Sequence, residues 1–225
     1  MRTFAPKRRL ASALPPDLGP EEFASRGGVS RETLARVKAY LGLLQDWSTR
    51  HNLVSAGSLA DLWRRHIWDS AQIVPLIPES STSLVDLGSG AGFLGLVLAI
   101  LFRARPAFRT VLYEATRKKC VFLKAAAEAT DVSVDVRHAR IEDAARESFD
   151  VVTARACAPL TKLLGYAMRF QGPHTTNLFL KGQSVDAELT EAHKSWKMSV
   201  VRHQSQTNPS GTVLEIREFA RVAPR

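Results

Sequence analysis

The spacing of hydrophobic residues changes part-way along the chain. In residues 34–47 they recur at steps of three and four, a pattern that predicts an amphipathic helix with Ser30 as its N-cap. Further helical patterns run through residues 58–77 and stop at Pro78. From Leu84 onward, short apolar runs alternate with helical patterns. The second part of the chain is therefore expected to consist of strands and helices in turn.

Five strands are expected in this second part, each followed by a helix, and two more strands close the chain. The strands are expected at residues 84–87, 110–113, 133–137, 150–154, 177–180, 198–203 and 212–219, and the helices at residues 93–102, 116–130, 141–146, 159–170 and 185–196. Repeated strand–helix units favour a parallel sheet. The turn sequence at residues 208–211 joins the last two strands as a hairpin, which places one antiparallel strand at the end.

These elements predict an α/β fold of the Rossmann-like kind, with a mostly parallel seven-stranded sheet and a small helical N-terminal cap. Residues 1–28 are rich in Arg, Pro and Gly and are expected to form a basic, flexible arm with one short helix near Glu21. Residues 29–80 would be the helical cap. Residues 81–225 would be the core, forming one compact unit with the cap.

Composition favours a cytoplasmic protein with one α/β domain. The chain has 225 residues, of which 45% are hydrophobic, enough for one well-buried domain and a modest extension. No signal peptide is evident at the N-terminus. The longest apolar stretch, residues 96–102, is far shorter than a membrane span requires. Cys120 and Cys157 are isolated in apolar surroundings and are expected to be reduced packing residues.

The net charge of +9 is concentrated at the two ends of the chain, whereas the middle is nearly neutral. A basic surface attracts phosphate backbones and speeds their encounter with the protein. Many basic proteins bind no nucleic acid, so charge alone leaves the partner open.

A glycine-rich stretch at residues 84–95 carries the strongest chemical signal. It reads Leu-Val-Asp-Leu-Gly-Ser-Gly-Ala-Gly-Phe-Leu-Gly, an apolar strand followed by glycines and then a helix. Glycine amides at a strand end and a helix N-terminus suit an anionic or nucleotide-like ligand.

Two cofactors compete for this loop, and a tight turn without a ligand is the third possibility. Gly90-x-Gly92-x-x-Gly95, with Glu114 further on, matches the dinucleotide fingerprint. However, Asp86 and Gly88 already end the strand, and an acidic group there would repel a pyrophosphate. A carboxylate suits the cationic amino and sulfonium groups of S-adenosylmethionine, so Asp86, Gly88 and Gly90 favour that cofactor. The fold class is then that of a class I methyltransferase.

The ends of the other strands supply further candidates, because ligands lie across the carboxyl ends of a parallel sheet. Glu114 would meet ribose hydroxyls, and Ile141 with Glu142 would cover the adenine. Arg155 and Lys181, after the fourth and fifth strands, would flank the acceptor. Each also has a structural alternative: a solvated carboxylate, acidic residues opening a short helix, or an ordinary salt bridge.

The acceptor chemistry follows from the motifs that are present and missing. No Asn-Pro-Pro-Tyr-like sequence follows the fourth strand, and Cys157 is not preceded by Pro. Exocyclic amino methylation and attack through a cysteine at a pyrimidine carbon are therefore disfavoured. A ring nitrogen with a free lone pair, such as guanine N7, needs no general base, and Arg155 and Lys181 would only position the substrate. No metal is expected.

Several motifs in order resemble the bacterial 16S ribosomal RNA guanine-N7 methyltransferase family, also called glucose-inhibited division protein B. They are Asn52-Leu53, Arg65-His66-x-x-Asp69-Ser70, residues 86–93, Arg140-Ile141-Glu142, Arg155-Ala156 and Leu180-Lys181-Gly182. The resemblance covers residues 34–219. It implies S-adenosylmethionine as cofactor, a guanine of 16S ribosomal RNA as target and a small-subunit particle as partner, with no role for DNA or a membrane.

Carried over position by position, the resemblance implies roles for particular residues. Gly88, Phe93, Ile141, Glu142 and Arg155 match cofactor contacts, while His66, Asp69 and Lys181 match motif positions without an assigned role. Three features depart from the family pattern, and one of them is that the arm before Glu21 matches no family motif. Leu94 stands where the family usually has Pro, and residues 157–159 read Cys-Ala-Pro in place of Phe-Ala-Ser.

Two hypotheses complete the sequence-based interpretation. His66 and Asp69 are three residues apart and share a helix face, so with Ser70 they are expected to turn toward the cofactor cleft and close it; a surface ion pair is the alternative. The activity is expected to be RNA methylation. The alternatives are a small-molecule methyltransferase, a catalytically silent RNA-binding protein with the same fold and, least favoured, a dehydrogenase.

Overall fold

A computed structural model describes residues 14–15, 17–51, 53–54, 56–59, 61–105 and 107–222. Residues 1–13 and 16, which make up half of the predicted N-terminal arm, and Asn52 of the first family motif lie outside these residues. No helix in the described ranges is both long and apolar enough to cross a lipid bilayer.

The elements follow one another as the hydrophobic pattern predicts, with small shifts at their ends. In chain order they are α1 (Pro20–Gly27), α2 (Arg31–His51), α3 (Ala56–Leu59), the π-helical segment η1 (Trp63–Trp68), α4 (Asp69–Ala71), the 3₁₀ turn η2 (Val74–Leu76), β1 (Ser83–Leu87), α5 (Gly95–Phe102), β2 (Arg109–Glu114), α6 (Arg117–Ala129), β3 (Asp135–His138), the 3₁₀ turn η3 (Ile141–Asp143), β4 (Val151–Arg155), α7 (Leu160–Ala167), β5 (Thr176–Lys181), α8 (Val185–His193), β6 (Trp196–Gln204) and β7 (Thr212–Arg221).

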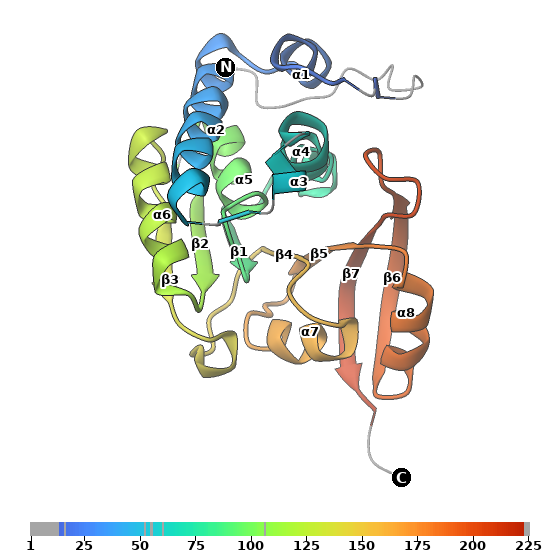
Figure 1. Cartoon of the computed structure of the whole chain (residues 1–225). Coiled ribbons are helices and arrows are strands. Elements are labelled where there is room, and N and C mark those ends of the chain that lie inside the picture. Colours follow the sequence, from blue (N-terminus) through green and yellow to red (C-terminus); the bar gives the residue numbers. More distant parts are fainter. Residues whose placement is uncertain are drawn as a thin grey trace.

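The seven strands form one sheet in the order β3-β2-β1-β4-β5-β7-β6 (Figure 1). Strands β1 to β5 pair in parallel, and β7 is antiparallel to both β5 and β6. The predicted fold class is confirmed, as is the final hairpin. The sequence pattern placed the antiparallel strand at the end, whereas β7 lies inside the sheet.

The burial of the two hairpin strands explains this order. The first five residues of β7 are all buried, whereas β6 alternates between buried or half-buried and exposed positions along most of its length. A strand that is buried on both faces is typical of the interior of a sheet. A strand with exposed polar side chains can lie at the edge of a sheet, and β6 lies at one edge of this sheet.

Successive side chains of β1 point to opposite faces of the sheet, and the core accordingly has two layers. Leu84 packs with residues of α2, α5 and α6, whereas Val85 and Leu87 pack with residues of α7 and α8 on the other face. Figure 1 shows α7 on the opposite side of the sheet from α2, α5 and α6. Asp86 falls on the same face as Leu84, which directs its carboxylate toward the start of α5.

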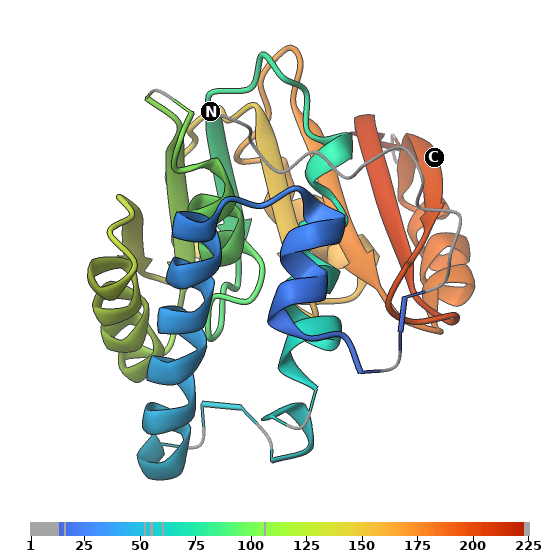
Figure 2. The same cartoon turned by 90° about the horizontal axis from the view of Figure 1, so that it is seen from above.

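The N-terminal helices lie over the first of these faces. Figure 2 shows α1 and α2 there, and they pack against each other. The short helix expected near Glu21 is α1. Ser30 caps α2 as expected, because its hydroxyl accepts the N–H of Thr33 at 3.2 Å.

The helical run predicted over residues 58–77 is broken into four short segments. In η1 the N–H of Asp69 bonds the carbonyl oxygen of Arg64, five residues back, and Pro75 lies in the separate turn η2. A π-helical turn inserts an extra residue and re-aims the side chains that follow. Two further helices are shorter than expected. The helix expected at residues 141–146 is only the turn η3, and the helix expected to end at Trp196 ends at His193, so that Trp196 begins β6.

Candidate active site

The loop after β1 has its shape because three of its glycines adopt left-handed backbone conformations. Gly88, Gly90 and Gly92 have φ angles of 70°, 59° and 87°, which residues with a Cβ rarely adopt. The fourth glycine has a steric role instead. A Cβ on Gly95 would lie 2.6 Å from Cβ of Asp86, so only glycine lets α5 start this close to β1. Leu94, where the family usually has Pro, is buried in the core, and its carbonyl accepts the N–H of Leu98.

Asp86 holds this loop from below. Its side chain is only 1% exposed, and its two oxygens accept hydrogen bonds from Thr153 at 2.8 Å and from the N–H of Gly95 at 3.1 Å. Burial raises the pKa of Asp86, although these hydrogen bonds oppose the rise. The carboxylate thus joins β1, β4 and the start of α5.

Glu114, the last residue of β2, supports the loop from the side. Its carboxylate accepts the N–H of Gly90 at 2.9 Å and the N–H of Thr116 at 2.7 Å. Each carboxylate oxygen has two lone pairs, so further acceptor capacity remains for hydroxyl donors. The position after β2 is the one at which the sequence predicted a ribose contact.

A cavity of about 240 Å³ lies above this loop and contains most of the predicted cofactor residues. Asp86, Gly88, Gly90, Phe93, Glu114 and Arg155 line it, together with residues not predicted, among them Ser89 and Lys119. Only one heavy atom, the carbonyl oxygen of Gly88 at 3.9 Å, approaches the position of a Cβ on Gly90. A side chain there would enter the space in which a ligand lies against the loop. The glycine loop and the carboxylate therefore fit an adenosine-bearing cofactor.

Ile141 and Glu142 are not among the residues that line this cavity. Ile141 is 8% exposed and packs in the core layer that Val85 and Leu87 share with α7 and α8. Glu142 is exposed and accepts the Tyr166 hydroxyl at 2.5 Å, which is the main cause that lowers the pKa of Glu142. Their predicted contact with adenine stays a prediction.

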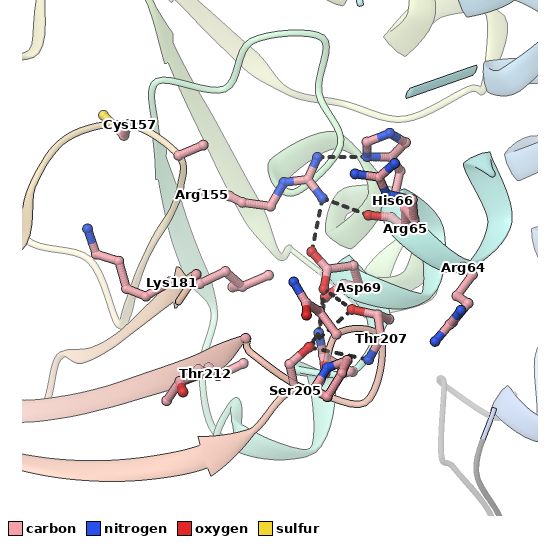
Figure 3. A pocket seen from close by; sticks show the side chains of 18 of the residues that line it. Arg64, Arg65, His66, Asp69, Arg155, Cys157, Lys181, Ser205, Thr207 and Thr212 are labelled. Carbon is pink, nitrogen blue, oxygen red and sulfur yellow. Dashed lines mark hydrogen bonds and ion pairs between the residues drawn. The ribbon is translucent and has the colours of Figure 1, made fainter. Parts of the chain in front are cut away.

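Arg155, at the end of β4, is held by residues of the N-terminal helices (Figure 3). One guanidinium nitrogen donates to Asp69 at 3.0 Å and to the carbonyl of Arg65 at 3.1 Å. The other lies 2.9 Å from Nδ1 of His66. Because a guanidinium can only donate, Nδ1 of His66 is the acceptor and carries no proton.

Phe93 forms the base of this cluster. The His66 ring stacks on it with centroids 3.9 Å apart, and the Arg155 guanidinium lies 5.2 Å from its centre. The hydroxyl of Ser70, which is fully buried, lies against the carbonyls of His66 and Phe93. The structure thus brings His66, Asp69 and Ser70 together with the strand ends, and their role in closing the cleft stays a prediction.

Asp69 also binds the tip of the β6–β7 hairpin. Its Oδ1 accepts the hydroxyl of Thr207 at 2.5 Å and the amide of Gln72 at 2.8 Å. Gln72 in turn accepts the N–H of Gln206 at 2.7 Å. The hairpin tip, defined here as residues 205–211, is therefore attached to the helical segment that contains Asp69 and Gln72.

Lys181, at the end of β5, is anchored rather than extended toward solvent. Its ammonium group donates to Glu188 and to the carbonyl of Ala158, both at 2.7 Å, and the side chain is 8% exposed. Glu188 also accepts the N–H of Leu160 and the hydroxyl of Ser184. Burial alone would raise the pKa of Glu188, but these donors outweigh it and the pKa lies below its usual value.

Ala156 is a site residue that sequence reasoning missed. Its φ angle is 50°, an uncommon conformation that costs a non-glycine residue about 1–2 kcal/mol. Such strain persists where the flanking residues are held in place, as Arg155 is here, and it is concentrated at functional sites. The methyl side chain of Ala156 is small, and the residue lines both the cavity above the glycine loop and a second, larger cavity.

A second cavity, of about 960 Å³, adjoins the first. Four regions line it: the segment from Asp61 to Gln72, the loop after β4, Lys181 with Glu188, and the hairpin tip. Arg155 and Ala156 line both cavities. The sequence predicted the hairpin turn but not its place at this cavity, because the contacts of the tip with Asp69 and Gln72 join residues more than a hundred positions apart. In the described part of the chain, no group of three or more His, Cys, Asp or Glu could hold a metal ion.

A glycine-rich loop after β1, a carboxylate at the end of β2 and a second cavity beyond β4 and β5 define a class I S-adenosylmethionine-dependent methyltransferase. Solved structures agree at the level of fold. An O-methyltransferase from Bacillus cereus in complex with SAH superposes with a TM-score of 0.55 at 14% identity, covering 80% of this chain and 91% of that chain. A ribosomal protein L11 methylase from Lactobacillus delbrueckii gives 0.56 at 13% identity, covering 68% and 79%.

The family model for rRNA small subunit methyltransferase G matches residues 33–215. Proteins named ribosomal RNA small subunit methyltransferase G are 48% identical over 93% of this chain in Parvibaculum lavamentivorans and 40% identical over 89% in Caulobacter vibrioides, covering 94% and 92% of those proteins. The chain belongs to the rRNA small subunit methyltransferase G family. It is an S-adenosylmethionine-dependent enzyme that methylates small-subunit ribosomal RNA, so the resemblance and the cofactor predicted from the sequence are confirmed.

Proposed function

We propose that the enzyme methylates N7 of a guanine in 16S ribosomal RNA, and that its substrate is a small-subunit particle in the cytoplasm rather than DNA. Hydrogen bonds within the larger cavity support this proposal. Asp61, Asp69 and Glu188, the carboxylates that line it in the described ranges, all accept hydrogen bonds from the protein. Burial raises the pKa of the Cys157 thiol to about 11. The carboxylates therefore have structural roles within the protein, and N7, whose lone pair is free, needs no general base.

The protein's contribution would then be alignment. When bound, S-adenosylmethionine supplies a methyl group on a positively charged sulfur. Gly90 and Glu114 would hold the cofactor in the smaller cavity, with Asp86, Gly88 and Phe93 shaping its floor. Arg155 and Lys181, both anchored, would fix the guanine in the larger cavity. Orienting two reactants at contact distance can supply much of the rate enhancement of such a displacement.

The N-terminal helices would complete the site. We infer that residues 29–80 act as a cap on the core formed by residues 81–225. His66, Asp69 and Ser70 would keep the cleft closed by contacting Arg155 and Phe93. The burial of His66 and Ser70, and the contact of Asp69 with Arg155 at the end of β4, support this role over that of a surface ion pair.

Methyl transfer to separate substrates tests the proposal. Bare 16S ribosomal RNA, small subunits lacking the modification and duplex DNA would each be incubated with labelled S-adenosylmethionine. Borohydride reduction followed by aniline cleaves RNA at N7-methylguanine, so the label and the cleavage should coincide at one guanine, with small subunits the best substrate. Label on an exocyclic nitrogen, or equal labelling of DNA, would contradict the proposal.

The variant Arg155→Ala tests in the same assay whether Arg155 positions the substrate. We expect it to lower kcat/KM by about a hundredfold, the usual effect of removing one positioned donor. An activity equal to that of the unmodified enzyme would show that Arg155 does not position the substrate.

A further inference from the structure

Four arginine and lysine side chains of the described residues line the larger cavity, and two of them are already neutralised. Arg155 pairs with Asp69 at 3.0 Å and Lys181 pairs with Glu188 at 2.7 Å. A paired cation presents little net charge to a phosphate, because the carboxylate beside it cancels most of its field. The backbone of an RNA substrate therefore needs other partners at this cavity.

The other two cations, Arg64 and Arg65, lie in η1 and have no such partner. No described carboxylate lies within ion-pair distance of either guanidinium. The nearest acid in sequence, Asp61, accepts the backbone N–H of Arg64 at 3.3 Å. Arg65 is exposed, and its carbonyl, not its side chain, contacts Arg155.

Arg64 has a further property that points to a ligand. Its Nε is buried and has no hydrogen-bond partner among the described residues. A buried donor without an acceptor is costly, typically by about 1–3 kcal/mol, and calls for an explanation. An acceptor supplied by a bound molecule would remove that cost.

We propose that Arg64 and Arg65 bind phosphate groups of the ribosomal RNA backbone on either side of the target nucleotide. This inference rests on the proposed function of the same cavity. Planar guanidinium groups match phosphate oxygens in charge and geometry. Figure 3 shows the two side chains turned in different directions from η1. Divergent neighbours of this kind would contact different phosphates rather than share one.

The π-helical turn gives these residues their positions. Arg64, Arg65 and His66 all belong to this turn, and Asp69 follows it within reach of Arg155 and Thr207. The segment that anchors Arg155 would therefore also hold the RNA backbone. Phosphate contacts of this type set register and orientation without reading sequence.

Glutamine variants of the two arginines test the inference. Arg64→Gln, Arg65→Gln and the double variant would be compared with the unmodified enzyme on unmethylated small subunits. We expect KM to rise about tenfold per arginine, the size of one charge-assisted hydrogen bond, with kcat changed little. The slope of log Kd against log salt concentration should fall by about one per arginine removed. Affinity for S-adenosylmethionine, measured by calorimetry, should not change and also reports correct folding.

Arg146→Gln with Lys197→Gln is the matched control, because it removes the same charge from exposed residues. Arg146 precedes β4 and Lys197 lies near the start of β6, so both are at the end of the sheet opposite the cavity. This control should leave KM almost unchanged. The inference would be overturned if the double Arg64/Arg65 variant had an unaltered KM and salt slope. It would also be overturned if the control variant showed an equal rise in KM and an equal fall in the salt slope.

Failure of the proposed function would look different. If the unmodified enzyme placed its methyl group elsewhere than on guanine N7 while the arginine variants still bound small subunits weakly with a reduced salt slope, only the proposed reaction would be wrong. If guanine N7 were methylated and the variants behaved as the unmodified enzyme does, only the phosphate contacts would be wrong.

Discussion

The charged residues of the site are held by the protein before any ligand binds. Asp86 is bound by Thr153 and by the N–H of Gly95. Arg155 is fixed by the cap and Lys181 by Glu188. Groups held in this way need little reorganisation during the reaction, which is how enzymes stabilise a transition state efficiently.

Gly90→Val tests the contribution of the glycine loop. With φ at 59° and open space at the Cβ position, valine would both strain the backbone and fill the cofactor cavity. We expect binding of S-adenosylmethionine to fall below detection by calorimetry. Gly19→Ala is the control, because Gly19 has a φ of −103° and no atom of the described residues, its chain neighbours aside, lies within 4 Å of its Cβ position. Binding to the valine variant at normal affinity would contradict the assignment.

Asp150→Asn tests a carboxylate that joins β4 to β1. One oxygen of Asp150 accepts four hydrogen bonds from Thr82 and Ser83. Burial alone would raise the pKa of Asp150, but these bonds outweigh it and the pKa lies below the usual value. The ionised group therefore stabilises the fold above the unfolded-state pKa of about 3.9, and this stabilisation is lost as pH falls through the lower folded-state pKa.

At pH 7 we expect Asp150→Asn to reduce the free energy of unfolding by about 1–2 kcal/mol. Denaturant unfolding at a series of pH values measures this difference, which should shrink below pH 4 or so as the native carboxylate is protonated. The exposed residue Asp46 provides the comparison, and Asp46→Asn should change little. A deficit that persisted unchanged in acid would show that ionisation of Asp150 is not the cause.

At the scale of elements, the same residue type has opposite roles in two helices. Gly42 lies inside α2, exposed, with no atom within 4 Å of its Cβ position. Gly95 begins α5, where all eight residues are buried. The first glycine weakens its helix, whereas the second lets a helix pack directly on a strand.

Alanine substitutions should separate these two roles. Gly42→Ala should raise the free energy of unfolding by about 0.5–1 kcal/mol, because alanine restricts the unfolded chain and favours helix. Gly95→Ala should lower it by about 1–3 kcal/mol, because the new methyl group overpacks the contact with Asp86. Thermal and denaturant unfolding measure both. Equal effects of the two substitutions would contradict the packing argument.

At the scale of the whole molecule, Asp69 connects three parts that are distant in sequence. It lies in the cap and binds Arg155 at the end of β4 and Thr207 at the hairpin tip. All three parts line the larger cavity. Its shape therefore depends on the complete fold rather than on any one element.

Thr207→Val removes the hydrogen bond from the hairpin tip to Asp69, one of several between these parts, and preserves the size of the side chain. We expect faster amide hydrogen exchange in residues 205–211 and a KM for small subunits raised by about fivefold, with unchanged affinity for S-adenosylmethionine, since the lost bond contributes about 1 kcal/mol. Thr190→Val removes only a local bond on α8 and should alter none of these quantities. Exchange rates at the tip that did not change would show that other contacts hold it.

The sequence alone determined the elements and the cofactor loop. Strand–helix alternation predicted the sheet, and the glycines at positions 88, 90 and 92 predicted a loop with positive φ angles. These features depend on residues that are neighbours in the chain, so a local pattern contains them. The same reasoning placed Glu114 and Arg155 at strand ends, because parallel strands present their carboxyl ends at one edge.

Only the tertiary structure decided how these elements meet. The π-helical break in the cap, the position of β7 inside the sheet and the anchoring of Lys181 by Glu188 depend on packing between elements. The contact of Asp69 with Thr207 joins residues 138 positions apart. No local pattern encodes such a pair, because its formation follows from closing long loops around a shared core. The larger cavity, which is lined by parts joined through these distant contacts, therefore became visible only in the folded chain.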